Sequence, residues 1–247
     1  MVNYKVIVSY DGTRYKGWQN LGRGELTIQD TLEEAIKNVL DYTVQIHGSG
    51  RTDAGVHAKG QVFSMKVPFR LTDEFQEKVN EKLPEDIRIL SVERAAGKFH
   101  ARYSAAKKTY CYYVDTNEKQ SVFQRKYTYH FPYELDLKAM EKAKNSLIGT
   151  HDFSSFTDDK IPEKDKIRML ESIEIKENRG IISIVYCGNG FLQHMVRILT
   201  GTLLEVGEGK RKPEELSVIL NKKERAAAGF LVPAKGLFLE KVYYVEK

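Results

Sequence analysis

The order of hydrophobic periods along the chain restricts the fold more than any other feature of the sequence. Alternating apolar and polar side chains predict strands, and a spacing of three to four residues predicts helices. In the first half these segments are a strand at 4–10, a helix at 28–40 behind the capping residue Thr27, strands at 44–47 and 61–67, a helix at 75–83 and a strand at 87–92. The first half is therefore predicted to run strand–helix–strand–strand–helix–strand.

The second half repeats this order loosely, without a repeat in the sequence itself. Strands are predicted at 109–114, 127–131, 168–176, 181–187 and 237–244, and helices at 137–147, 192–206 and 214–220. Gly207 is predicted to close the long helix in a left-handed conformation, and the charged segment 157–166 is predicted to be an exposed loop. The pattern predicts an α+β protein with mostly antiparallel sheets and two halves, residues 1–105 and 106–247.

Length and composition exclude several classes of protein. A chain of 247 residues with 41% hydrophobic side chains is long enough for one large domain or two ordinary ones. Its apolar runs are far shorter than the roughly 18 residues of a membrane span, and its N-terminal residues lack the pattern of a signal peptide. Cys111 and Cys187 are its two cysteines, too few for a disulfide framework or a zinc knuckle. We therefore expect a cytoplasmic protein.

The net charge of +5 is concentrated in residues 94–108. This stretch has no acidic residue, and its five basic residues, which equal the whole net charge, are Arg94, Lys98, Arg102, Lys107 and Lys108. Phe99 and Tyr103 lie among them. Basic residues mixed with aromatic ones favour a polyanion whose bases can stack. A solvated surface loop is the alternative, and the charge pattern alone leaves both open.

A glycine-rich segment at 48–60 lies between two predicted strands. It holds four glycines, typical of a loop with special dihedral angles or close contact with a ligand. Its spacing matches neither a phosphate-binding loop nor a dinucleotide fingerprint. A metal site from His47, Asp53 and His57 would lack helical ligand spacing. Asp53 is then either a carboxylate that caps its own turn or a nucleophile or base.

The residues of this loop are similar to the signature of a known enzyme family. Residues 50–58, Gly-Arg-Thr-Asp-Ala-Gly-Val-His-Ala, resemble the signature of the tRNA pseudouridine synthase A family. Further segments agree with the family pattern in the same order, namely 99–103 with 108–112, 152–156, 190–197 and 233–237. The resemblance spans nearly the whole chain.

The resemblance implies isomerisation of uridine to pseudouridine in tRNA, without a cofactor or a metal. Asp53 would be the nucleophile, attacking C6 of the base or C1′ of the sugar, or assisting a glycal route. Arg197 would pair with Asp53 and favour its charged form. Tyr110 would stack on the uracil, and Leu237 would supply an apolar wall, although core packing would also explain both. The implied fold is two ferredoxin-like, or RRM-like, α+β halves that meet at a central active-site cleft.

The same resemblance implies contacts with the anticodon stem-loop of tRNA, at positions 38, 39 and 40, by a homodimer. The target base must be flipped out of its stack, and Arg51 would enter the vacated position. Further contacts with phosphates are predicted for the basic residues Arg102, Lys107, Lys108, Lys59, Arg14 and Arg23.

Two other functions remain open at this point. The first is a non-catalytic tRNA-binding protein or chaperone, which the charge pattern supports equally well. The second is a hydrolase that uses Asp53 with His57 as a base. We expect His57 and His194 to be structural rather than acid–base groups.

Overall fold

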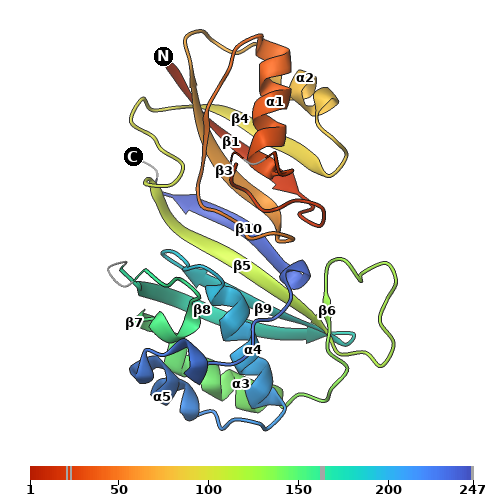
Figure 1. The fold of residues 1–247 in the computed structure, drawn as a ribbon, viewed down its shortest axis with the longest axis vertical. Coiled ribbons are helices and arrows are strands. Elements are labelled where there is room, and N and C mark those ends of the chain that lie inside the picture. The colour runs from red at the N-terminus through yellow and green to blue at the C-terminus, as the bar shows by residue number, and fades with distance from the viewer. Residues whose placement is uncertain (21, 23, 162–164, 246–247) are drawn as a thin grey trace. The chain divides into compact units, whose positions relative to one another are not determined.

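The chain forms two compact units in the computed structural model, which describes residues 1–20, 22, 24–161 and 165–245 (Figure 1). The first unit is Met1–Ala106 with Phe238–Lys247, and the second is Lys107–Leu237. The final segment, which the sequence places in the second half, thus groups with the first unit by its contacts. The prediction of an α+β protein with mostly antiparallel strands is confirmed.

The first unit has the strand and helix order predicted from its periodicity. Its elements are β1 (Val2–Tyr10), α1 (Ile28–Leu40), β2 (Ile46–Gly48), β3 (His57–Val67), α2 (Phe75–Lys82) and β4 (Ile87–Ala95). The strands lie in the order β4-β1-β3-β2, and all neighbours are antiparallel, as in a ferredoxin-like unit. Strand β10 (Leu237–Tyr244) pairs in parallel with the start of β3, where Phe238 lies opposite His57.

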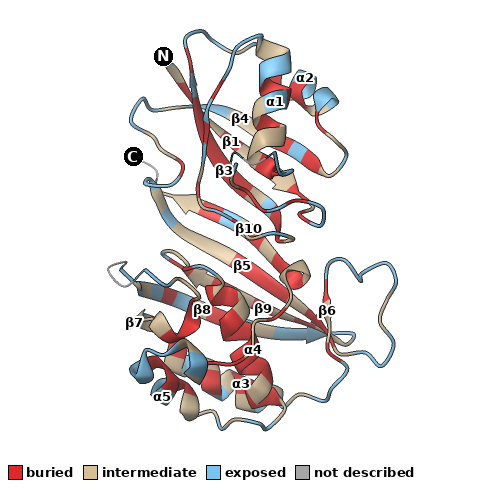
Figure 2. Cartoon of the chain, viewed as in Figure 1, coloured by how far each residue is buried: buried red, intermediate tan, exposed pale blue. Residues whose placement is uncertain are grey.

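The core of the first unit lies between its sheet and its two helices (Figures 1 and 2). Every second residue of β1 from Tyr4 to Tyr10 is buried, which confirms the alternation predicted for this strand. Helix α1 begins where predicted, because the Thr27 hydroxyl accepts a hydrogen bond from the backbone N–H of Asp30 at 3.2 Å. Its buried side chains include Leu32 and Ile36.

The second unit is built on the antiparallel sheet β5-β9-β8-β7, and β6 runs parallel beside β5. Its strands are β5 (Ala105–Asp115), β6 (Tyr129–His130), β7 (Gly149–Asp152), β8 (Ile167–Asn178) and β9 (Ile181–Gly188). Its helices are α3 (Leu137–Lys144), α4 (Met195–Gly207) and α5 (Glu215–Lys222), with single 3₁₀ turns η1 (Asn145–Leu147), η2 (Ser154–Phe156), η3 (Arg225–Ala227) and η4 (Ala234–Gly236). The predicted hairpin is confirmed: Arg179 and Gly180 have φ of 51° and 73°, which suits a tight turn between β8 and β9.

The glycine-rich loop is shorter than its sequence predicts. Strand β3 already begins at His57, so the loop between β2 and β3 covers residues 49–56. Gly60 makes this possible, since a Cβ at that position would lie 2.7 Å from the carbonyl oxygen of Glu240 on β10. The glycine therefore permits close approach of two strands rather than a flexible loop.

The C-terminal end of α4 also differs from the prediction. The left-handed residue is Gly209, with φ of 74°, whereas Gly207 still belongs to the helix. A Cβ at Gly207 would lie 2.8 Å from the sulfur of Met140 on α3. Gly207 is thus explained by close packing of two helices, and Gly209 by the conformation that ends the turn.

Candidate active site

The loop that carries Asp53 is held in one conformation by buried hydrogen bonds to its own strand. The Ser49 hydroxyl donates to Oε1 of Gln61 at 2.7 Å, and Nε2 of Gln61 donates to the carbonyl of Gly50 at 3.0 Å. Both Ser49 and Gln61 are fully buried. Because these groups lie away from water, each bond that is lost leaves an unpaired polar atom, so the start of the loop is rigid.

Backbone hydrogen bonds from the segment that follows β1 also hold this loop. The Trp18 N–H donates to the carbonyl of Thr52 at 3.1 Å, and the Gly55 N–H donates to the carbonyl of Tyr15 at 3.3 Å. The Thr52 hydroxyl is hydrogen bonded to the Tyr10 hydroxyl at 2.9 Å in a buried position. The residues on both sides of Asp53 are therefore fixed from a neighbouring segment.

Asp53 itself begins a tight turn. Its carbonyl accepts a hydrogen bond from the N–H of Val56 at 3.1 Å, and Gly55 within the turn has φ of 77°. Thr52 is buried, Asp53 is half-buried and Arg51 is exposed. The backbone thus turns Thr52 into the core and leaves Arg51 on the surface, beside a carboxylate that is partly shielded from water.

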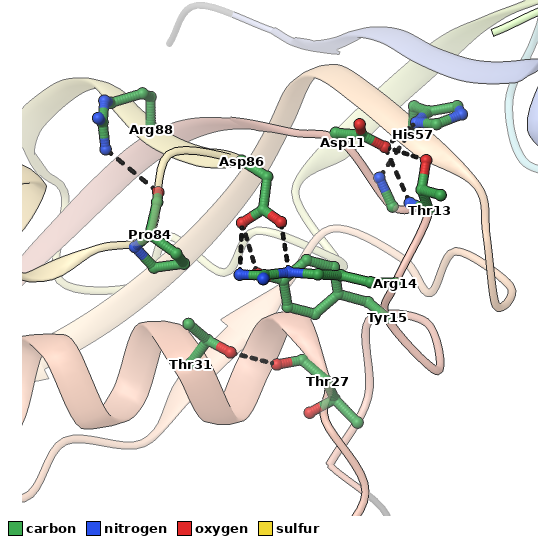
Figure 3. Close-up of polar contacts among 11 residues, drawn as sticks. Asp11, Thr13, Arg14, Tyr15, Thr27, Thr31, His57, Pro84, Asp86 and Arg88 are labelled. Carbon is green, nitrogen blue, oxygen red and sulfur yellow. Dashed lines mark hydrogen bonds and ion pairs between the residues drawn. The ribbon is translucent and has the colours of Figure 1, made fainter. Parts of the chain in front are cut away.

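His57 is buried at the end of this turn, where β3 begins (Figure 3). Its Nδ1 lies 3.1 Å from the Gly12 nitrogen and 3.1 Å from Oδ1 of Asp11, and its ring stacks on Phe238 at 4.6 Å. The side chain is 1% exposed. These contacts explain its presence in the motif by packing, and they favour a structural role over the base of a hydrolase.

Some of the basic residues predicted to contact RNA are already engaged with carboxylates. Nε of Arg14 lies 2.6 Å from Asp86 (Figure 3), and Nζ of Lys59 lies 2.9 Å from Glu240. In the second unit, Nζ of Lys107 lies 2.9 Å from Glu171. Each carboxylate partly neutralises its cation and so weakens the attraction of that side chain for a phosphate.

The other predicted cations have different surroundings. Arg51 and Arg102 are exposed, and Lys108 is half-buried on β5. Arg23 lies outside the described residues. The Arg14 guanidinium also contacts the Tyr15 hydroxyl. Burial of Tyr15 and its hydrogen bond to Asp86 raise the pKa of this phenol to about 12. Among the predicted cations that the structure describes, Arg51 and Arg102 are therefore exposed and have no ion pair with a carboxylate.

The second unit positions Tyr110 on β5. Tyr110 lies opposite Tyr186 of β9 and meets the Phe191 ring edge-on, with the ring centroids 5.0 Å apart. Its side chain is 8% exposed. The ring is therefore fixed by its neighbours in a nearly fully buried position.

Arg197 lies on α4, where its helix neighbours are apolar and buried. Its Nε donates to the carbonyl of Val232 at 2.8 Å, so the half-buried guanidinium is held by the chain before β10. Burial raises the pKa of Tyr112 above its ordinary range, and the positive charge of Arg197 opposes that rise, which places the two side chains near each other. These contacts do not fit an arginine whose side chain extends along the helix into solvent.

Leu237 follows a segment that packs on the same tyrosine. The hydroxyl of Tyr112 donates to the carbonyl of Pro233 at 2.7 Å, and a Cβ at Gly236 would lie 2.7 Å from its ring. Leu237 is 5% exposed. The second unit thus brings Arg197 and the segment before Leu237 together around Tyr112.

A polar cluster near the start of α4 has no counterpart in the sequence pattern. Asp158 lies in the segment predicted to be an exposed loop, yet its carboxylate accepts from Nδ1 of His194 at 2.6 Å and from Nε of Arg225 at 2.9 Å. Burial acts to raise the pKa of Asp158, but the hydrogen bonds from His194 and Arg225, together with their charges, outweigh it and lower the pKa below its ordinary value. The three residues are far apart in sequence, so no local pattern could have indicated the cluster.

The residues that the structure describes contain no candidate metal cluster and no candidate membrane helix. Within that part of the chain, no three His, Cys, Asp or Glu side chains are grouped so that they could hold a metal ion. Nor does any described helix combine the length and apolar character needed to cross a membrane.

Comparison with known proteins identifies the family. A family model described as tRNA pseudouridine synthase matches residues 6–104 and 143–245. Over 245 residues, the chain is 44% identical to tRNA pseudouridine synthase A of Bacillus sp. (strain KSM-64) and 46% identical to tRNA pseudouridine synthase A 1 of Clostridium tetani (strain Massachusetts / E88). Each alignment covers 99% of this chain and 100% of the relative.

A third relative is similar over nearly its whole length. The tRNA pseudouridine synthase A of Geobacillus kaustophilus (strain HTA426) is 42% identical, with 98% of this chain and 95% of that protein covered. These matches confirm the family that the residues around Asp53 predicted. The chain therefore belongs to the tRNA pseudouridine synthase family and is an isomerase.

Proposed function

We propose that this protein isomerises uridine to pseudouridine at positions 38, 39 and 40 of tRNA, in the anticodon stem-loop. The reaction breaks the bond between C1′ and N1, turns the uracil, and joins C5 to C1′. No electrons enter or leave, so the reaction needs no redox cofactor. The observation that carries the proposal is a half-buried aspartate, Asp53, in a rigid loop that matches the family in sequence.

Asp53 acts as the nucleophile in this proposal. A nucleophilic carboxylate must be ionised, oriented and partly shielded from water. The hydrogen bonds to Thr52 and Gly55 support the orientation, because they hold the backbone on both sides of Asp53. The half-buried position supports the shielding.

Arg197 and Tyr110 complete the site from the second unit. Arg197 pairs with Asp53 and favours its charged form, and Tyr110 stacks on the uracil while the glycosidic bond is broken and remade. Leu237 supplies an apolar wall. Support comes from the fixed positions of Tyr110 against Phe191 and of Arg197 against Val232.

The substrate reaches this site by base flipping, which costs a few kcal/mol of lost stacking. Arg51 enters the vacated stack, and its exposed position beside Asp53 supports that role. Arg102 and Lys108 contact phosphates. Arg14, Lys59 and Lys107 contribute less, because carboxylates already neutralise part of their charge. The protein acts in the cytoplasm as a homodimer on which one tRNA contacts both subunits.

One assay tests the proposed reaction and the role of Asp53. A tRNA transcript tritiated at C5 of its uridines is incubated with the protein, without metal or nucleotide, and released tritium is counted. Asp53→Asn should reduce release to the level without enzyme. Asp41→Asn is the matched control, because it removes the same charge from an exposed residue of the same unit. Undiminished release by Asp53→Asn would overturn the assignment, and tRNA binding without release by the parent protein would favour a non-catalytic binder.

A further inference from the structure

Four planar side chains form a ladder on the surface of the first unit. The rings of His47 and His100 stack with centroids 5.2 Å apart and planes 24° apart. The ring of Tyr103 lies 4.5 Å from that of His100, and the guanidinium carbon of Arg102 lies 5.8 Å from the centroid of Tyr103. His47, Arg102 and Tyr103 are exposed and His100 is half-buried. We call this set the ring ladder.

The loop under the ring ladder is firmly attached to the sheet. Ala101 is fully buried, its N–H donates to the Ser64 hydroxyl at 3.1 Å, and its carbonyl accepts from the Tyr244 hydroxyl at 2.8 Å. The side-chain amide of Asn3 donates to two further carbonyls of the loop, at 2.9 and 2.8 Å. The loop is therefore rigid, yet the Tyr103 ring that it carries is 79% exposed. Such a ring adds little to folding, because most of its area stays in water.

The surroundings of the ring ladder are positive. Three of its four members, His100, Arg102 and Tyr103, lie in the acid-free stretch 94–108, and the charge of Lys66 on β3 acts on His100. Among the described residues, neither Lys66 nor Arg102 has a carboxylate within ion-pair distance. Burial lowers the pKa of His100, and the positive charges of Arg102 and Lys66 lower it further. Both cations therefore lie close enough to His100 to act on its ring. An anion that approaches the exposed ring meets cations that no acid of the described chain neutralises.

An exposed, pre-oriented aromatic ring beside unneutralised cations matches the chemistry of single-stranded RNA. A base offers a flat face for stacking, and its phosphate offers the charge that Arg102 and Lys66 attract. A purely apolar partner would gain nothing from the cations. We propose that the ring ladder binds an unpaired base of the tRNA by stacking on Tyr103. This base is not the reacting uracil, which the proposed function assigns to Tyr110, and the inference rests on tRNA being the substrate.

The affinity test separates stacking from catalysis. Binding of a tRNA transcript with uridines at positions 38, 39 and 40 is measured at fixed salt in the Asp53→Asn background, where no turnover occurs. Tyr103→Ala should raise Kd about tenfold, within the range measured for loss of one base–aromatic stack. Tyr103→Phe keeps the ring and should bind as the parent does. Tyr42→Ala, which removes an exposed ring of the same unit that packs on Phe69, is the matched control.

A cross-link identifies the partner directly. Transcripts with 5-iodouridine at single loop positions are irradiated on the parent protein, and attachment at Tyr103 is expected for one unpaired position. Equal Kd values for Tyr103→Ala and the parent would overturn the inference, as would a change of oligomeric state in place of a change in Kd. The melting temperature of Tyr103→Ala should match that of the parent. If Asp53→Asn keeps full tritium release while Tyr103→Ala still weakens binding, the proposed mechanism fails and the stacking site stands.

Discussion

Substituting Gly12 by alanine should displace the catalytic loop through a single methyl group. A Cβ at Gly12 would lie 2.0 Å from the carbonyl oxygen of Val56 and 2.6 Å from its carbonyl carbon. Real Cβ contacts are almost never shorter than 3.0 Å, so the backbone at Val56 must move by about 1 Å. The N–H of Val56 donates to the carbonyl of Asp53, so the whole turn moves with it.

The expected loss of activity follows from this displacement. A shift of about 1 Å at a reacting group costs roughly 100-fold in rate, and overpacking costs about 1–3 kcal/mol of stability. Gly12→Ala should therefore lower kcat for tritium release about 100-fold and lower Tm by roughly 2–12 °C. Rates are measured well below the new Tm so that the variant is folded. Activity within about twofold of the parent would refute the argument that backbone contact at Val56 positions Asp53.

Gly97→Ala is the control for this experiment. No heavy atom lies within 4 Å of a Cβ built at Gly97, and its backbone is not in the left-handed region. The same chemical change should therefore leave kcat and Tm unaltered. A loss of activity in both variants would indicate that loss of glycine flexibility, and not the clash at Val56, causes the effect.

The other predictions concern stability. The Tyr10 and Thr52 hydroxyls are hydrogen bonded in a buried position, so Tyr10→Phe and Thr52→Val should each lower the free energy of unfolding in urea by about 1–3 kcal/mol. The double variant should lose less than the sum of the two, and additive losses would contradict the coupling between the two hydroxyls. The lowered pKa of Asp158 means that it contributes stability above the ordinary aspartate pKa, and that this contribution is lost as the pH falls through the lower folded value. In Asp158→Asn, the free energy of unfolding should therefore fall less steeply below about pH 4 than in the parent, as measured by circular dichroism. An unchanged pH dependence would exclude Asp158 as a source of acid lability.

Most elements and the residues of the Asp53 loop could be predicted because their signals are local. Alternation in β1, the cap at Thr27 and the helical stripe of α1 each lie within about a dozen residues and depend on backbone geometry alone. The glycines were harder to interpret. Gly60 and Gly207 permit close approach of neighbouring elements, and a sequence does not show which element will be the neighbour.

The electrostatics of the surface depend on pairs that are distant in sequence. Asp86, Glu240 and Glu171 partly neutralise Arg14, Lys59 and Lys107, respectively. A count of charges along the chain therefore overstates how strongly these cations attract an RNA phosphate. Such pairs form only where the fold brings distant segments together, because the attraction between two charges depends on their separation in space.

The sequence by itself determined the α+β class, the order of elements and the family, because hydrophobic periods and a contiguous motif are properties of short segments. The tertiary structure alone decided what holds Asp53 in place, since Tyr10 and Trp18 reach Thr52 from across the unit. It also stacked His47 on His100, residues more than fifty positions apart. Contacts of this kind depend on the path of the chain, which no local pattern specifies.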